Sequence, residues 1–151
     1  MYVLYSFGGL VETLFKIYYG NTNGVLYFIG LYIGGLLFAT LPALRKHSDN
    51  PSYLAVGASG AVSAVVFASI ILEPTGGMGL IFLPGLHIPS FIFGIIYLFA
   101  EHYMSKKGGS RIAHDAHIGG AVFGIIYLAF VDYTTFINFF NKINLWIGNI
   151  F

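Results

Sequence analysis

The sequence predicts an all-helical bundle that crosses a membrane several times, and two observations carry this prediction. Of the 151 residues, 57% are hydrophobic and only 9% are charged, whereas soluble domains carry about 25% charged residues. Three long segments contain no Asp, Glu, Lys or Arg, namely residues 17–44, 50–72 and 74–100. A helix needs about 20 apolar residues to cross the hydrocarbon layer. We therefore expect a polytopic membrane protein.

Five hydrophobic segments predict about five transmembrane helices. They cover residues 1–19, 25–44, 59–73, 88–104 and 116–131. A turn-like stretch at 20–24 and polar loops at 45–51 and 106–111 separate some of them. Pro84 and Pro89 stand at the entry of the fourth segment.

Counted from Ser59, the third segment is too short to cross a bilayer, so either residues 53–58 extend the helix or the helix begins inside the membrane. Its apolar part, Ser59–Leu72, has 14 residues, about 21 Å as a helix, against a hydrocarbon core of about 30 Å. Gly57 and Gly60 flank Ser59 and loosen the start of the helix. Irregular backbone at membrane depth occurs only where protein or a wet cavity surrounds it. We therefore expect the helix to begin inside the membrane, with Ser59 at its start.

The last 18 residues differ from the rest. Residues 134–151 contain four Asn and Lys142 among aromatic and aliphatic residues, a pattern that favours an amphipathic helix lying in the membrane interface. A sixth crossing would place these polar groups in lipid at high cost. We therefore divide the chain into a transmembrane core, residues 1–133, and an amphipathic or interfacial tail, residues 134–151.

Alternating helix directions place two reactive residues on the same side of the membrane. The third and fifth segments cross in the same direction, so that Ser59 and His117, near their starts, lie at similar depth. A serine becomes a nucleophile when an adjacent base takes its proton, and neutral imidazole is the usual base. A helix N-terminus also offers free N–H groups for a developing oxyanion.

The motifs around these residues extend the argument to a family. Gly57-Ala58-Ser59-Gly60 and Ala116-His117-Ile118-Gly119-Gly120, with Gly124 further on, resemble the Gly-x-Ser-Gly and Ala-His-x-x-Gly motifs of rhomboid intramembrane serine proteases. Gly8-Gly9-x-x-Glu12 is similar to the end of that family's second core helix. The resemblance runs from Met1 to about Asp132.

The resemblance implies an intramembrane serine-type endopeptidase that cleaves transmembrane protein substrates with a Ser–His dyad. Ser59 would be the nucleophile and His117 the general base. Gly57 and the Ser59 backbone would support the oxyanion, while Gly60, Gly120 and Gly124 would let the two helices pack closely. It also implies a multi-pass integral protein, which we expect in the bacterial inner membrane.

Two departures from the family pattern affect the expected activity. In register with the family, an oxyanion motif His-x-x-x-Asn would end just before Met1, and a first helix would precede it. We therefore expect an N-terminally truncated chain with weak or no activity of its own. Ser63 stands where some members have an aromatic ring packed on the catalytic histidine, which predicts that His117 is less firmly held.

Other interpretations of the polar residues predict no second functional site. His114, Asp115 and His117 include metal-binding residue types, but the sequence has no His-Glu-x-x-His and no evident third ligand. We therefore expect no metal and no other cofactor. Glu12 and Glu101 lie near segment ends, where reaching the interface is the default.

Two alternative functions remain. One is a non-catalytic rhomboid-like protein that binds transmembrane segments, although such relatives usually lose the serine or the histidine. The other is a small transporter, which would need charges along a path in the middle of the membrane. No charge lies in the middle of the second to fifth segments.

Nucleic acid is not an expected partner, since a net charge of +1 provides no basic surface. The lipid bilayer and transmembrane substrates are the expected ones.

Overall fold

The computed structural model describes residues 2–46, 58–80, 83–107 and 114–150. These residues form helices and one short hairpin, so the all-helical prediction is confirmed. In chain order the elements are α1 (Tyr2–Tyr19), α2 (Asn21–Lys46), α3 (Ser59–Leu72), β1 (Gly77–Leu80), β2 (Leu83–Pro89), α4 (Ser90–Lys107), α5 (His114–Val131) and α6 (Thr134–Gly148).

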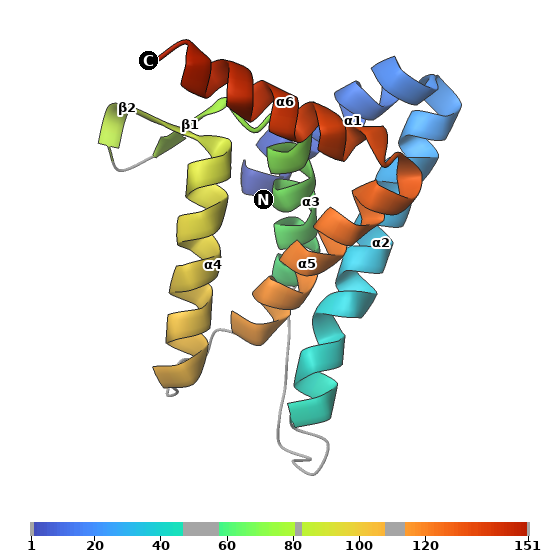
Figure 1. Cartoon of the computed structure of the whole chain (residues 1–151). Helices are drawn as coiled ribbons and strands as arrows, with labels where there is room; N and C mark the ends of the chain where they lie inside the picture. The colour runs from blue at the N-terminus through green and yellow to red at the C-terminus, as the bar shows by residue number, and fades with distance from the viewer. Residues whose placement is uncertain (1, 47–57, 81–82, 108–113, 151) are drawn as a thin grey trace.

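Helix α3 forms the centre of the bundle. Figure 1 shows it between α4 on one side and α2 and α5 on the other, with α6 lying across one end. From Gly60 to Leu72 nearly every residue of α3 is buried, as expected for a helix that is apolar on all sides. Val65 packs in one core cluster with Val11, Phe15, Leu31 and Leu128 from α1, α2 and α5. The expected start at Ser59 is therefore the start of the innermost helix.

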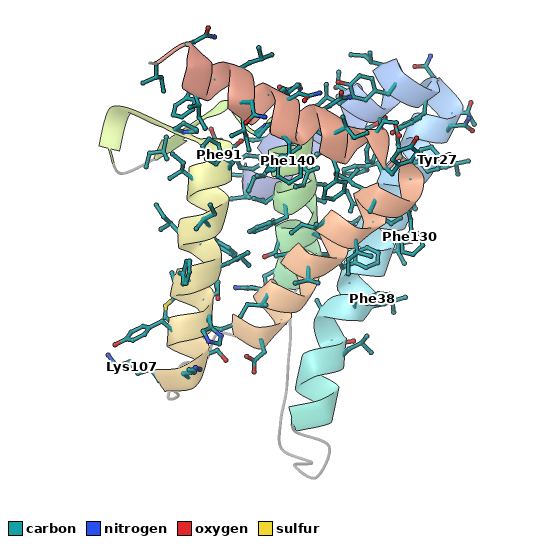
Figure 2. All side chains as sticks on the ribbon, viewed as in Figure 1. Tyr27, Phe38, Phe91, Lys107, Phe130 and Phe140 are labelled. Atoms are coloured by element: carbon teal, nitrogen blue, oxygen red, sulfur yellow. The ribbon has the colours of Figure 1, made fainter. Side chains whose placement is uncertain are left out.

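The outer surface of the bundle is strongly apolar. Large hydrophobic side chains are exposed on α1, α2, α4, α5 and α6, and Phe130 on α5 is 87% exposed. Figure 2 shows Phe130 and Phe38 on the outward side, where α5 and α2 run together. A soluble monomer rarely exposes large contiguous apolar patches, whereas lipid accepts them. The surface thus agrees with an integral membrane protein.

The described helices differ in whether they reach the length and hydropathy of a membrane span. Among the described residues, Asn21–Leu41 and His114–Val131 are long and apolar enough to span a membrane, and Ser59–Leu72 is apolar but shorter. The expected count of about five transmembrane helices stays a prediction.

Two local features differ from the sequence-based expectation. The predicted turn at 20–24 shrinks to Gly20, whose φ of +84° suits glycine, and α2 already begins at Asn21. The stretch before the fourth segment, expected only as an entry with prolines, contains the antiparallel pair β1–β2, in which Gly77 lies opposite Pro89. The hairpin ends at Pro89, directly before α4. A proline at a helix start removes no hydrogen bond of the helix, so it is tolerated there.

Helix α6 closes the end of the bundle at which α3 terminates. The Lys142 ammonium donates to the Leu72 carbonyl at 2.8 Å and to the Glu73 carboxylate at 2.8 Å. A cation at a helix C-terminus satisfies an unpaired carbonyl and interacts favourably with the helix dipole. Asp132, just before α6, accepts hydrogen bonds from the Thr134 N–H and hydroxyl at 2.9 and 2.7 Å. The Lys142 contacts attach α6 to the end of α3, and the Asp132 contacts hold the turn that leads into α6.

Replacing Lys142 with Met should lower the stability of the bundle by about 0.5–1 kcal/mol, since both partners are about one third exposed and solvent screens the pair. Lys16→Met is a matched control, because the Lys16–Glu12 pair is equally exposed but lies within α1. Thermal unfolding in detergent should show the larger loss for Lys142→Met. Equal losses for both variants would contradict a role for Lys142 in joining α6 to α3.

Asp132 should make the stability of the turn into α6 depend on pH. Hydrogen bonds from the Thr134 side chain and backbone hold the pKa of this carboxyl below its ordinary value. The stabilisation is therefore fully present above about pH 4, the unfolded value, and is lost as the pH falls through the lower folded pKa. Unfolding temperatures of the wild type and Asp132→Ala, measured between pH 2 and 6, should converge at the acidic end. A difference that is independent of pH would contradict this.

Candidate functional site

Ser59 lies at an open helix start. The first backbone bond of α3 runs from the Val62 N–H to the Ala58 carbonyl at 3.0 Å, and Ala58 contributes no side-chain cap. The N–H groups of Ser59, Gly60 and Ala61 therefore precede the hydrogen-bonded part of the helix, as at any helix N-terminus. Ser59 itself is exposed. This arrangement places a hydroxyl beside backbone donors. Gly57, expected to support the same site, lies outside the described residues.

Helix α5 approaches α3 closely enough to exclude side chains. A Cβ on Gly120 would collide with the Gly60 carbonyl oxygen, and a Cβ on Gly124 with the Ala64 carbonyl oxygen. These glycines follow His117 by three and seven residues and share its helical face. Gly60 is equally confined, because a Cβ there would meet the Ala39 side chain and the Ala116 carbonyl. The predicted packing role of Gly60, Gly120 and Gly124 fits this geometry.

Ser59 and His117 open into one cavity of about 670 Å³. Most of its wall is apolar, from α1, α2, α3 and α4, and the polar groups in it are few. The lining residues other than Ser59 and His117 are Val3, Leu4, Phe7, Tyr32, Ala58, Val62, Ser63, Val66, Phe93 and Tyr97. In the described part of the chain, no hydrogen bond joins Ser59 to His117. Catalytic hydrogen bonds are often long without substrate and tighten in the complex.

Glu101 does not lie where its position near a segment end predicts. It was expected to reach toward the membrane interface, but it is only 6% exposed and lies against α5. Its Oε1 is 3.0 Å from Nδ1 of His117 and its Oε2 is 2.6 Å from Nδ1 of His114. The expectation failed because a buried imidazole pair offers the carboxylate two donors, which compensate for the loss of water. No local signal in the sequence of α4 indicates these partners.

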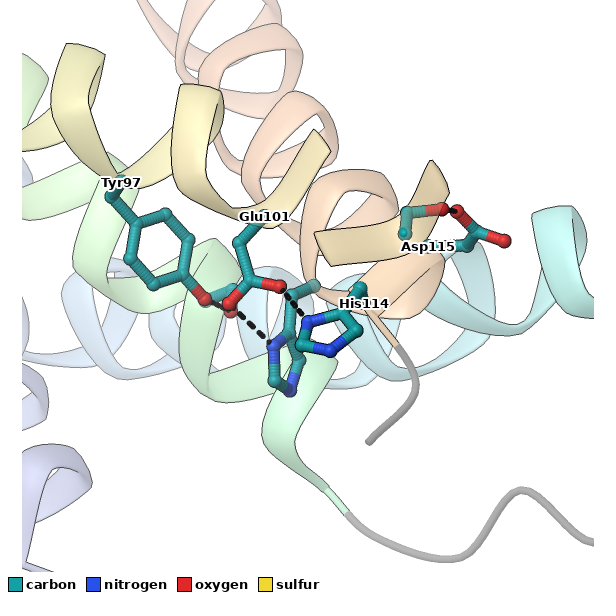
Figure 3. A network of polar contacts seen from close by, with 7 residues as sticks. Tyr97, Glu101, His114 and Asp115 are labelled. Carbon is teal, nitrogen blue, oxygen red and sulfur yellow. Dashed lines mark hydrogen bonds and ion pairs between the residues drawn. The ribbon is translucent and has the colours of Figure 1, made fainter. Parts of the chain in front are cut away.

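Figure 3 shows how the polar residues of α4 meet those of α5. Tyr97 and Glu101, four residues apart on α4, point to the same side, and His114 faces the Glu101 carboxylate. Asp115 turns away from this cluster and accepts a hydrogen bond from Ser105. The Tyr97 hydroxyl lies 3.1 Å from the Ser63 hydroxyl. Ser63, expected to leave His117 loosely held, thus pairs with a tyrosine of α4, while Glu101 contacts the histidine.

The same cluster corrects the statement that no third metal ligand is evident. Glu101, His114 and His117 each offer a ligand atom, and these atoms lie within 4.8 Å of one another. Two imidazoles and a carboxylate form a donor set that suits several transition metals. In the present geometry each of the two Nδ1 atoms already contacts a carboxylate oxygen at hydrogen-bond length. The contacts observed are those of a hydrogen-bonded network.

Comparisons with known proteins point to one family. The model of the rhomboid domain matches residues 1–133. RHOMBOID-like protein 12, mitochondrial, of Arabidopsis thaliana is 26% identical over 139 residues, covering 79% of this chain and 41% of that protein. Presenilin-associated rhomboid-like protein, mitochondrial, of Homo sapiens is 28% identical over 131 residues, covering 86% of this chain and 32% of that protein.

A third relative, presenilin-associated rhomboid-like protein A, mitochondrial, of Danio rerio, is 29% identical over 134 residues, covering 86% of this chain and 32% of that protein. The chain thus spans between about a third and two fifths of the length of these relatives. No solved structure matches it. The relatives named are mitochondrial proteins, which conflicts with the expected bacterial inner membrane.

Replacing Gly120 with Ala should destabilise the bundle by about 1–3 kcal/mol, since an added methyl group meets backbone that cannot move aside. Gly9→Ala is the matched control, because a Cβ at Gly9 has nothing within 4 Å, and removing a helical glycine is neutral or slightly stabilising. Thermal unfolding in detergent checks both variants. Equal stability of Gly120→Ala and the wild type would contradict the close packing of α5 on α3.

Proposed function

Because the chain belongs to the rhomboid family, we propose that it acts as an intramembrane serine endopeptidase on transmembrane protein substrates. The observation that carries the proposal is the shared cavity of Ser59 and His117. Both residues lie at helix starts that α5 and α3 bring together through Gly120 and Gly124. A nucleophile, a base and free backbone donors around one cavity are the parts that acyl transfer requires.

In the proposed reaction, His117 first accepts the proton of Ser59 and later donates it to the leaving group. The Ser59 hydroxyl oxygen attacks the carbonyl carbon of the substrate, and its proton passes to Nε2 of His117. The backbone N–H groups at the start of α3 stabilise the negative oxygen of the tetrahedral intermediate. As the C–N bond breaks, His117 returns the proton to the departing amine, which leaves an acyl ester on Ser59. Water activated by His117 then hydrolyses this ester.

The position of the cavity supports a transmembrane substrate. Val3, Leu4 and Phe7 of α1 line one side and Phe93 of α4 lines another. Among the described elements, α1 and α4 do not pack on each other. An apolar segment that arrives from the bilayer would therefore meet apolar side chains between these two helices before it reaches Ser59. Inside lipid the substrate backbone is helical, so its local unwinding near Ser59 is part of the proposal.

A second candidate function is binding of transmembrane segments without cleavage. The observation in its favour is the mostly apolar lining of the cavity, which suits a bound apolar segment whether or not Ser59 reacts. The two functions share the cavity and differ in whether Ser59 reacts.

The membrane in which the protein resides is a separate part of the proposal. The relatives carry mitochondrial names, which conflicts with the bacterial inner membrane expected from the sequence. Localisation of a tagged chain in its native cell decides this point.

The protease should be labelled by a fluorophosphonate probe at Ser59. The protein is expressed from its native gene, so that any residues preceding Met1 are included, and is labelled in detergent or liposomes. Ser59→Ala should abolish labelling because the nucleophile is gone, and His117→Ala should reduce it by at least about 10²-fold because the base is gone. Mass spectrometry of the labelled peptide identifies the site.

Ser69→Ala is the matched control for this experiment. Ser69 lies on the same helix, is buried away from the cavity and donates to the Val66 carbonyl, so its replacement should leave labelling unchanged. Labelling that persists in Ser59→Ala would contradict the proposed protease function. Capture of a model transmembrane segment by an unlabelled wild type would support the second function instead.

A further inference from the structure

We propose that Glu101 is a positioning residue for His117, so that the reactive group is a Ser59–His117–Glu101 relay and not a dyad alone. The inference rests on the proposed protease function and adds a residue of α4 to it. Its basis is the 3.0 Å contact between Glu101 Oε1 and His117 Nδ1. Glu101 acts through His117 and lines no part of the cavity that holds Ser59.

The contact determines which nitrogen of His117 is free. A carboxylate accepts and does not donate, so Nδ1 carries the proton and Nε2 keeps its lone pair. Nε2 is therefore the atom that can take the proton of Ser59. When it does so, the imidazolium forms beside a negative oxygen that stabilises it. A buried carboxylate on Nδ1 fulfils the same two roles in serine proteases of unrelated fold.

The burial of Glu101 shows that the pair is not an incidental surface contact. The Glu101 side chain is 8% exposed and that of His117 14%, so solvent screens the contact little. Both carboxylate oxygens are used, since His114 occupies the second one at 2.6 Å. His114 thereby holds the second oxygen of the carboxylate and limits its rotation. Three side chains from α4 and α5 thus form one rigid unit behind the cavity.

The three side chains are also a possible cation site, and the geometry favours the relay. A cation shared by these ligands would take the place of the protons on both Nδ1 atoms and separate them from the carboxylate oxygens. Instead, each nitrogen–oxygen pair lies at 2.6 or 3.0 Å, the distance of a charge-assisted hydrogen bond. Every buried side-chain polar atom in the described residues has a hydrogen-bond partner, which is compatible with the relay.

The test compares Glu101→Gln, Glu101→Asp and Ser105→Ala by their rates of fluorophosphonate labelling and of substrate cleavage. Glu101→Gln should lower kcat by about 10²-fold or more with little change in KM, since the amide does not enforce the reactive tautomer. Glu101→Asp keeps the charge and should recover part of the loss. Ser105→Ala removes another hydrogen bond between α4 and α5 and should retain the wild-type rate.

A wild-type rate in Glu101→Gln, or an equal loss in Ser105→Ala, would overturn the proposal. Loss of labelling in a metal chelator, with recovery on addition of zinc, would also overturn it in favour of a cation site. The relay predicts labelling that a chelator leaves unchanged.

A spectroscopic measurement separates this proposal from the protease function and needs no change at Glu101. In Ser59→Ala labelled with ¹⁵N-histidine, neutral His117 should carry its proton on Nδ1, with its signals assigned by comparison with a Ser59→Ala, His117→Ala double variant. A proton on Nε2 would refute the relay even where Glu101→Gln fails to fold. Failure of the wild type to label would refute the protease and leave the tautomer result standing.

Discussion

The approach of α5 to α3 is the constraint on which the rest of the structure depends. At Gly120 and Gly124 the backbone of one helix lies against carbonyl oxygens of the other, with no room for a side chain. Lipid provides no hydrophobic drive for helices to associate, so close van der Waals packing of small residues takes that role. The position of α5 along α3 is therefore fixed at the level of single residues, and the depth of His117 relative to Ser59 follows from it.

Much of this arrangement could be predicted from the sequence because it depends on short-range patterns. The absence of charge over long segments predicts helices in a membrane, and the short length of Ser59–Leu72, the central helix of the bundle, is evident from its sequence. The motifs around Ser59 and His117 place small residues on one face of each helix. These features need only helical periodicity and the thickness of a bilayer.

Glu101 could not be predicted in the same way, because its role depends on a contact between helices. Its neighbours on α4 are those of a residue near a helix end, and a single carboxyl at such a place normally reaches water. Only the packing of α4 against α5 brings His114 and His117 to its two oxygens. The hairpin β1–β2 could not be predicted for a similar reason, since Gly77 and Pro89 pair across a connection rich in glycine and proline.

The contacts of α4 link its position to the state of one imidazole ring. At its start α4 is tied to the turn after α3, where the Phe91 N–H donates to the Pro74 carbonyl at 2.9 Å. Toward its other end, polar contacts with α5 hold it. A displacement of that end away from α5 carries the Glu101 carboxylate with it and releases Nδ1 of His117. The free energy that docks α4 and the free energy that orients His117 are thus coupled quantities, each of which must respond to a change in the other.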